Sequence, residues 1–108
     1  MNLVEKTCVP CEGGVEPFNK KEADKYMAEI SGWSLDNKVR QISKEYKFKD
    51  HTKAMNFIKN VSAIAETEGH HPDMHIFYNK VLLELSTHSI NGLSENDFII
   101  AAKIDAMS

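Results

Sequence analysis

The sequence predicts an α+β fold, a two-layer sandwich in which a four-stranded antiparallel sheet carries three helices on one face. Two kinds of pattern lead to this prediction. Three segments place apolar residues at helical spacing, and two pairs of segments between them alternate apolar and polar residues. Alternating strands keep one face in water, so amphipathic helices are expected to cover the other face. The expected order is helix, two strands, helix, two strands, helix.

The first half of the chain predicts one helix and a pair of strands. Asn19 is a candidate N-cap, and Glu22 lies three residues later in the capping-box position. The helix is expected to end at Ser31-Gly32, because glycine tolerates the left-handed conformation found after helices. The two strands are expected at 33–35 and 39–48, with a turn between them at 36–38.

A second helix and a hairpin follow. Asp50 caps the helix, whose apolar residues recur at helical spacing as far as Ala65. Gly69 ends this helical pattern, and alternation begins after Pro72. Asn79-Lys80 is the candidate turn of the hairpin. Its strands are expected at 74–78 and 81–85.

The last helix has a strong start signal. Ser94 is the expected cap and Asp97 lies at the third helical position, as in an acidic variant of the capping box. Leu93 and Phe98 are spaced to pack as a hydrophobic staple. The helix is expected to run to about Ala106.

Length and composition indicate a single domain and exclude several classes of protein. A length of 108 residues predicts one domain, over residues 17–108. Residues 1–16 are predicted to form a flexible N-terminal arm. The net charge of −3, without a Lys/Arg patch, argues against direct nucleic-acid binding. No apolar run approaches the roughly 20 residues that span a bilayer, and the N-terminus lacks a signal-peptide core. A cytoplasmic protein without membrane contact is expected.

Cys8 and Cys11 form a Cys-x-x-Cys motif in the N-terminal arm. A redox role requires the motif to open a helix, whereas here Glu12-Gly13-Gly14 follows. A structural zinc site requires about four ligands, and the sequence has no second cysteine pair. We therefore expect reduced thiols in a flexible arm.

Histidines gather at the predicted helix-to-strand junction. His70, His71 and His75 lie in one short segment, and His88 follows the hairpin. As general acids and bases they would suit a small polar ligand, because the histidine pKa of about 6.5 lies near cellular pH. Glu66, one helical turn before His70, could fix an imidazole tautomer. A metal site and an incidental cluster remain alternatives, although Pro72 prevents His71 and His75 from sharing a helix face.

The combined spacing of these residues resembles a known family. The motif is an acidic residue, His-His-Pro, a Tyr-Asn-x-Val hairpin, Thr-His, and Gly-Leu before an acidic helix start. In this chain it reads Glu66, His70-His71-Pro72-Asp73, Tyr78-Asn79-Lys80-Val81, Ser86-Thr87-His88, Gly92-Leu93-Ser94 and Asp97. Over residues 17–106 the sequence thus resembles the pterin-4a-carbinolamine dehydratases, whose animal members double as dimerisation cofactors of a transcription factor. The Cys-x-x-Cys lead-in is similar to that of bacterial members.

The resemblance implies a hydro-lyase that converts 4a-hydroxytetrahydropterin to quinonoid dihydropterin, and so recycles the cofactor of aromatic amino acid hydroxylases. It implies no metal and no cofactor. By resemblance, His70 and His88 are the acid/base pair, His71 binds and orients the pterin, and Glu66 orients or tunes a histidine. The implied substrate-binding residues are Pro72, Asp73, Ser86 and Thr87.

The resemblance also implies an oligomer, because family members form dimers and tetramers. An alternative function remains open: a protein-binding dimerisation or regulatory module with little or no catalysis. Retention of the three family histidines and Glu66 favours the enzyme, because a scaffold would not need them.

Overall fold

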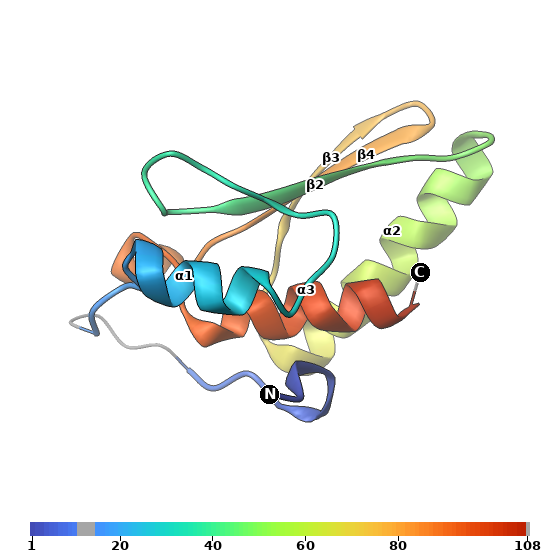
Figure 1. Cartoon of the computed structure of the whole chain (residues 1–108). Helices are drawn as coiled ribbons and strands as arrows, with labels where there is room; N and C mark the ends of the chain where they lie inside the picture. Colours follow the sequence, from blue (N-terminus) through green and yellow to red (C-terminus); the bar gives the residue numbers. More distant parts are fainter. Residues whose placement is uncertain (11–14, 108) are drawn as a thin grey trace.

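A four-stranded sheet with three helices on one face forms the described part of the chain, residues 1–10 and 15–107 of a computed structural model (Figure 1). The predicted α+β fold class and element order are therefore confirmed. The helices are α1 (Lys20–Met27), α2 (His51–Glu68) and α3 (Glu95–Met107). The strands are β1 (Ser34–Leu35), β2 (Ile42–Lys47), β3 (Asp73–Phe77) and β4 (Lys80–Leu85). Two short 3-10 helices, η1 (Leu3–Glu5) and η2 (His88–Ile90), complete the elements.

The predicted caps of α1 and α2 form. The Asn19 side chain accepts a hydrogen bond from the Glu22 N–H at 2.9 Å, and the Glu22 carboxylate accepts one from the Asn19 N–H at 3.0 Å. Asp50 accepts from the Lys53 N–H at 2.9 Å. The end predicted for α1 at Ser31-Gly32 is wrong, because the α-helix ends at Met27. Tighter turns follow it, in which the Glu29 and Ile30 N–H groups donate to carbonyls three residues earlier. Helix ends commonly tighten in this way.

The strand order in the sheet is β1-β2-β4-β3, and all neighbours are antiparallel. The side chains of Ile42, Val81, Leu83 and Leu85 are fully buried beneath the helices. Alternate residues of β2 and β4 point to the other face of the sheet, as the period of two predicted. The two longer strands therefore make a sheet with one apolar face, against which the helices pack.

Two turn boundaries differ from the predictions. The hairpin turn is Tyr78-Asn79, not Asn79-Lys80, because Phe77 pairs with Lys80. Tyr78 takes the left-handed conformation at φ +55° that a tight turn needs. β2 begins at Ile42 and not at Val39, since Val39 also has a positive φ, +56°, and lies in the loop.

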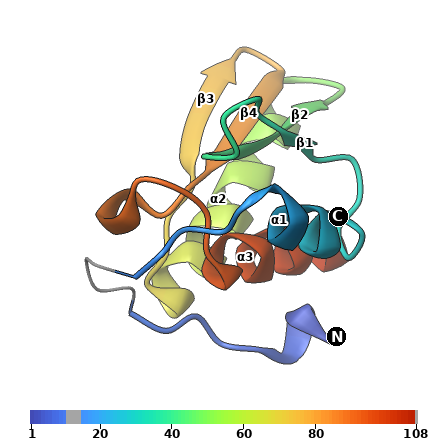
Figure 2. The same ribbon diagram turned by 60° about the vertical axis from the view of Figure 1, so that its left-hand side comes forward.

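The helix α3 is buried on nearly every side, which is unusual for a surface helix. One side faces the sheet and α2, and residues 1–10, here named the strap, lie on the side away from the sheet (Figures 1 and 2). Leu3 of the strap is 3% exposed, and the Val4 carbonyl accepts from Lys103 Nζ at 2.8 Å. The flexibility expected of residues 1–16 stays a prediction.

Glu95 at the start of α3 joins the strap to α1. Its Oε2 accepts from Lys6 Nζ at 2.9 Å and from the Tyr26 hydroxyl at 2.8 Å. These two hydrogen bonds lower the pKa of Glu95. Burial, followed by the bond to Glu95, raises the pKa of Tyr26 to about 12.

None of the helices in the described ranges is both long and apolar enough to cross a bilayer.

Candidate active site

A cavity of about 450 Å³ opens where the C-terminus of α2, the end of β4 and the strap meet. Most of the side chains around it are polar, and three are histidines. Its lining residues are Cys8, Val9, Pro10, Glu68, Gly69, His70, His71, Ser86, Thr87, His88, Ser89 and Asn96.

Gly69 directs the adjacent histidines into this cavity. It caps α2 in the left-handed conformation, at φ +68°, and its N–H donates to the Ala65 carbonyl at 2.8 Å. The chain leaves the helix axis there, so that His70 and His71 follow in the turn toward β3. The side chain of the next residue, Pro72, is buried and holds the segment in place.

His88 approaches the cavity from the other side. β4 ends at Leu85, and His88 begins the short helix η2 that follows it. An isolated β-bridge between Thr87 and Gly92 closes the loop that carries η2, with the Thr87 N–H donating to the Gly92 carbonyl at 2.7 Å. Gly92 has no room for a side chain, because a Cβ would lie 2.5 Å from Cβ of Pro17. Exposed His88 therefore lies on a loop with a tightly packed base.

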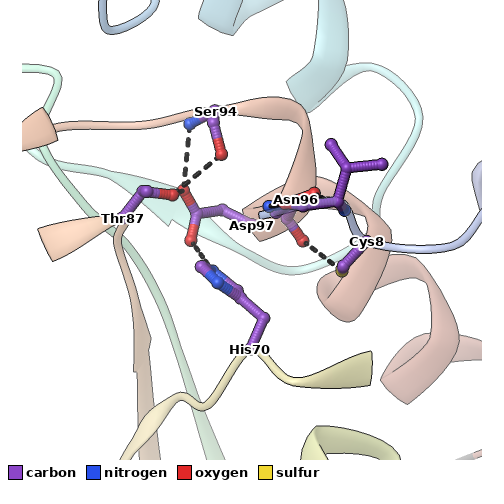
Figure 3. A network of polar contacts seen from close by, with 7 residues as sticks. Cys8, His70, Thr87, Ser94, Asn96 and Asp97 are labelled. Atoms are coloured by element: carbon purple, nitrogen blue, oxygen red, sulfur yellow. Dashed lines mark hydrogen bonds and ion pairs between the residues drawn. The ribbon is translucent and has the colours of Figure 1, made fainter. Parts of the chain in front are cut away.

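Asp97 is a buried carboxylate beneath the cavity (Figure 3). Its Oδ1 lies 2.6 Å from Nε2 of His70, and its Oδ2 accepts from the Thr87 hydroxyl at 2.8 Å and the Ser94 N–H at 3.0 Å. A carboxylate with 0% exposure and three donors is a fixed acceptor. Because a carboxylate only accepts, this contact favours the His70 tautomer that carries its proton on Nε2.

The second histidine pair is exposed. His71 Nε2 forms a hydrogen bond with the Glu66 carboxylate, whose side chain is 73% exposed. Within residues 1–10 and 15–107, the ring of His88 has no hydrogen-bonding partner. The cavity thus presents one histidine fixed by a buried carboxylate, one paired at the surface, and one free to meet a ligand.

The predicted site residues fall into two groups. Five of the eight line the cavity together: His70, His71, Ser86, Thr87 and His88. The other three do not line it. Glu66 contacts His71, Pro72 is buried behind the turn, and Asp73 opens β3 opposite Glu84.

The other two histidines, His51 and His75, lie elsewhere. His75 is on the strand β3, where its Nε2 lies 2.6 Å from the Glu84 carboxylate. His51 starts α2, and its Nδ1 lies 2.8 Å from the Tyr78 carbonyl oxygen. Neither lines the cavity.

Two features of the site were missing from the predicted set of site residues. Asp97 was predicted only as a helix-start residue, and its bond to the Ser94 N–H is the part of that prediction that the structure bears out. Its bond to His70 joins residues 27 positions apart, for which the sequence pattern held no signal. The other feature is the strap, which contributes Cys8, Val9 and Pro10 to the cavity.

The part of the chain that the structure describes gathers no group of three or more histidine, cysteine or acidic side chains able to hold a metal ion. Of the two motif cysteines, Cys8 is part-buried near α3, with its Sγ 3.7 Å from the Asn96 carbonyl oxygen. Cys11 lies outside the described residues, so the expectation for the Cys-x-x-Cys motif stays a prediction.

Comparison with known proteins agrees with this architecture. Curated relatives from Halorhodospira halophila and Rickettsia canadensis, each named "Putative pterin-4-alpha-carbinolamine dehydratase", are 44% and 49% identical to the chain. These matches cover 99% and 96% of this chain, and 98% and 95% of the relatives. A crystal structure from Brucella melitensis, described as a transcriptional coactivator/pterin dehydratase, superposes with a TM-score of 0.79 at 32% identity. It covers 85% of this chain and 98% of the other.

The matched region contains the whole of the sheet, the three helices and the histidines of the cavity. Residues 16–107 match the family described as Pterin 4 alpha carbinolamine dehydratase. With nearly full-length relatives above 40% identity and a shared fold, this chain belongs to the pterin-4a-carbinolamine dehydratase family.

Proposed function

We propose that the chain removes water from a 4a-hydroxytetrahydropterin to give the quinonoid dihydropterin, by histidine acid/base catalysis. The family and the names of its relatives support the coarser statement, that the protein is a pterin-4a-carbinolamine dehydratase and so a hydro-lyase. The use of histidines, the identity of the site residues and the role in recycling the pterin of aromatic amino acid hydroxylases are the proposal.

The reaction needs two proton transfers. The C4a–O bond breaks and the hydroxyl leaves as water after receiving a proton. N5 loses its proton, and a C4a=N5 double bond forms. Each transfer by a positioned side chain contributes roughly 10²–10⁴-fold to the rate. Two histidines that line one cavity could supply both transfers.

The observation that carries the proposal is the contact of His70 with the buried carboxylate of Asp97, at a cavity that His71 and His88 also line. A histidine oriented by a buried carboxylate is suited to exchange a proton through its other nitrogen. We assign His70 and His88 as the acid/base pair and Asp97 as the residue that positions His70.

The remaining site residues would bind and orient the flat heterocycle. His71, paired with Glu66, could hydrogen-bond an edge of the pterin. Ser86 and Thr87 line the cavity just beyond β4, where backbone groups no longer pair within the sheet. Pro72 and Asp73, which do not line the cavity, would act only by holding the His-His turn.

Single substitutions test this assignment. His70→Ala and His88→Ala should each lower kcat by roughly 10²-fold or more, while thermal unfolding shows both variants folded. His75→Ala is the matched control, because His75 is also bonded to a carboxylate but lies on the sheet. Its activity should stay within a few-fold of the unsubstituted chain. Normal turnover in both cavity variants would refute the acid/base assignment.

A protein-binding module is the second candidate function, supported by the coactivator description of the Brucella relative. The oligomeric state and cytoplasmic location expected from the sequence remain predictions. A folded protein that does not accelerate dehydration would favour this second candidate.

A further inference from the structure

We propose that Val9 contacts the pterin ring and sets its affinity, and that the Asn96 side chain holds Val9 at the mouth of the cavity. This proposal rests on the proposed dehydratase function. It concerns the strap, which no part of the acid/base assignment uses.

Asn96 binds the backbone of Val9 with both ends of its side-chain amide. The Val9 N–H donates to Oδ1 at 3.0 Å, and Nδ2 donates to the Val9 carbonyl at 2.5 Å. Asn96 is 5% exposed, so these bonds are partly shielded from competing water. The side-chain amide thus pairs with the N–H and the carbonyl of Val9 as a neighbouring strand would, and so fixes the position of the Val9 backbone.

A second anchor holds the preceding residue. The Cys8 N–H donates to Oε1 of Glu68 at 2.9 Å, and the other Glu68 oxygen lies 3.5 Å from Lys103 Nζ. Figure 3 shows Cys8 beside Asn96, next along α3 from the Asp97 that bonds His70. Pro10 further restricts Val9 to extended backbone conformations. The start of α3 therefore positions both the strap and the histidine.

The Val9 side chain is nevertheless left uncovered. It is 63% exposed, although its backbone is bound at both polar groups. The other side chains that line the cavity are mostly polar, and none of the described lining residues is Phe, Tyr or Trp. A pterin has flat faces that need apolar contact. Val9 and the adjacent Pro10 offer the apolar surface on which such a face could pack.

This arrangement predicts an effect on binding rather than on the chemical step. Contact with a ring face is equally available in the ground state and the transition state, so its loss should raise KM and leave kcat nearly unchanged. Val9→Ser keeps the backbone bonds to Asn96 and removes the apolar contact. We expect a KM increase of roughly 3- to 10-fold, with kcat within about twofold.

Val4→Ser is the matched control. Val4 is an exposed valine of the same strap, 44% exposed, and it does not line the cavity. Its substitution should leave KM unchanged. Asn96→Ala tests the positioning role: KM should rise at least as much as in Val9→Ser, and the Cys8 and Val9 amides should lose protection from hydrogen exchange while amides of α2 and β4 keep theirs.

The closing experiment measures KM, kcat and the affinity for 7,8-dihydrobiopterin, by calorimetry, in these variants and the unsubstituted chain. A higher KM and weaker pterin binding in Val9→Ser, with Val4→Ser unchanged, would support the proposal. An active chain whose KM and pterin affinity survive Val9→Ser would overturn it and leave the dehydratase function intact. An inactive chain that still loses pterin affinity in Val9→Ser would overturn the function alone, and one that binds no pterin would overturn both.

Discussion

The substitution Asp97→Asn isolates the role of the buried carboxylate, because it changes one atom and leaves the cavity lining intact. Thr87 and Ser94 both donate to Oδ2, so the single remaining oxygen is expected to stay opposite these two donors. The new amide N–H group then faces Nε2 of His70, 2.6 Å from the original Oδ1. Two donors cannot bond each other, so His70 must move its proton to Nδ1.

The size of the effect follows from that change of tautomer. Nδ1 is the nitrogen left for proton exchange, and a proton on it removes the basic form from the site. Loss of one positioned proton transfer predicts a fall in kcat of roughly 10²–10⁴-fold. Weakening of one buried hydrogen bond should lower the free energy of unfolding by about 1–3 kcal/mol. A domain stable by about 5–15 kcal/mol would remain folded.

The assay is the pH dependence of kcat and kcat/KM for carbinolamine dehydration, measured around the ordinary histidine pKa of about 6.5. Asp97→Asn should lower the activity and change the shape of the profile, which a purely structural role would not do.

Asp105→Asn provides the control on the same helix. Asp105 accepts from the Trp33 indole at 3.0 Å, the Ser31 N–H at 2.9 Å and Lys44 at 3.0 Å, yet it lies away from the cavity. The Asp105→Asn variant should have a lower free energy of unfolding but an unchanged kcat. If Asp97→Asn keeps kcat within threefold of the unsubstituted chain while folded, the orienting role of Asp97 is wrong.

Three further predictions concern stability and are checked by urea unfolding. The hydrogen bonds from Lys6 and Tyr26 lower the pKa of Glu95. They therefore stabilise the fold above pH 4.5, the ordinary pKa of the carboxyl group, and this stabilisation is lost as the pH falls from there through the lowered pKa. Glu95→Gln should flatten that acid dependence, and an unchanged slope would contradict the pairing. Burial raises the pKa of Tyr26 from 10.0 to about 12, so stability should fall as the pH rises between these values, and Tyr26→Phe should remove that part of the fall. Gly69→Ala should cost about 1 kcal/mol because of the positive φ at this helix cap, and equal stability would indicate that the cap relaxes.

Local signals made much of the fold predictable. The helix starts could be predicted because each depends on a hydrogen bond between residues only three positions apart. These starts are marked by Asn19, Asp50 and Ser94. The same holds for the histidine junction, because Gly69 ends α2 and Pro72 follows three residues after it. Boundaries set by pairing were harder to predict. The turn at Tyr78-Asn79 depends on the register between β3 and β4, which no turn residue specified.

The parts of the site that were missed depend on tertiary contacts. His70 and Asp97 meet only after α3 has packed against α2, and a capping pattern does not indicate a second partner for the carboxylate. The strap has no periodicity. Its position at the cavity arises because α3 is apolar on the side away from the sheet and needs a cover there.

The central claim is that this chain dehydrates a pterin carbinolamine by means of histidines. The most direct test generates the 4a-carbinolamine with an aromatic amino acid hydroxylase and follows quinonoid dihydropterin by absorbance, with and without a chelator. We predict that the protein accelerates dehydration, that the chelator has no effect, and that His70→Ala loses most of the acceleration. A folded protein that leaves the spontaneous rate unchanged, or one whose activity the chelator abolishes, would contradict the account.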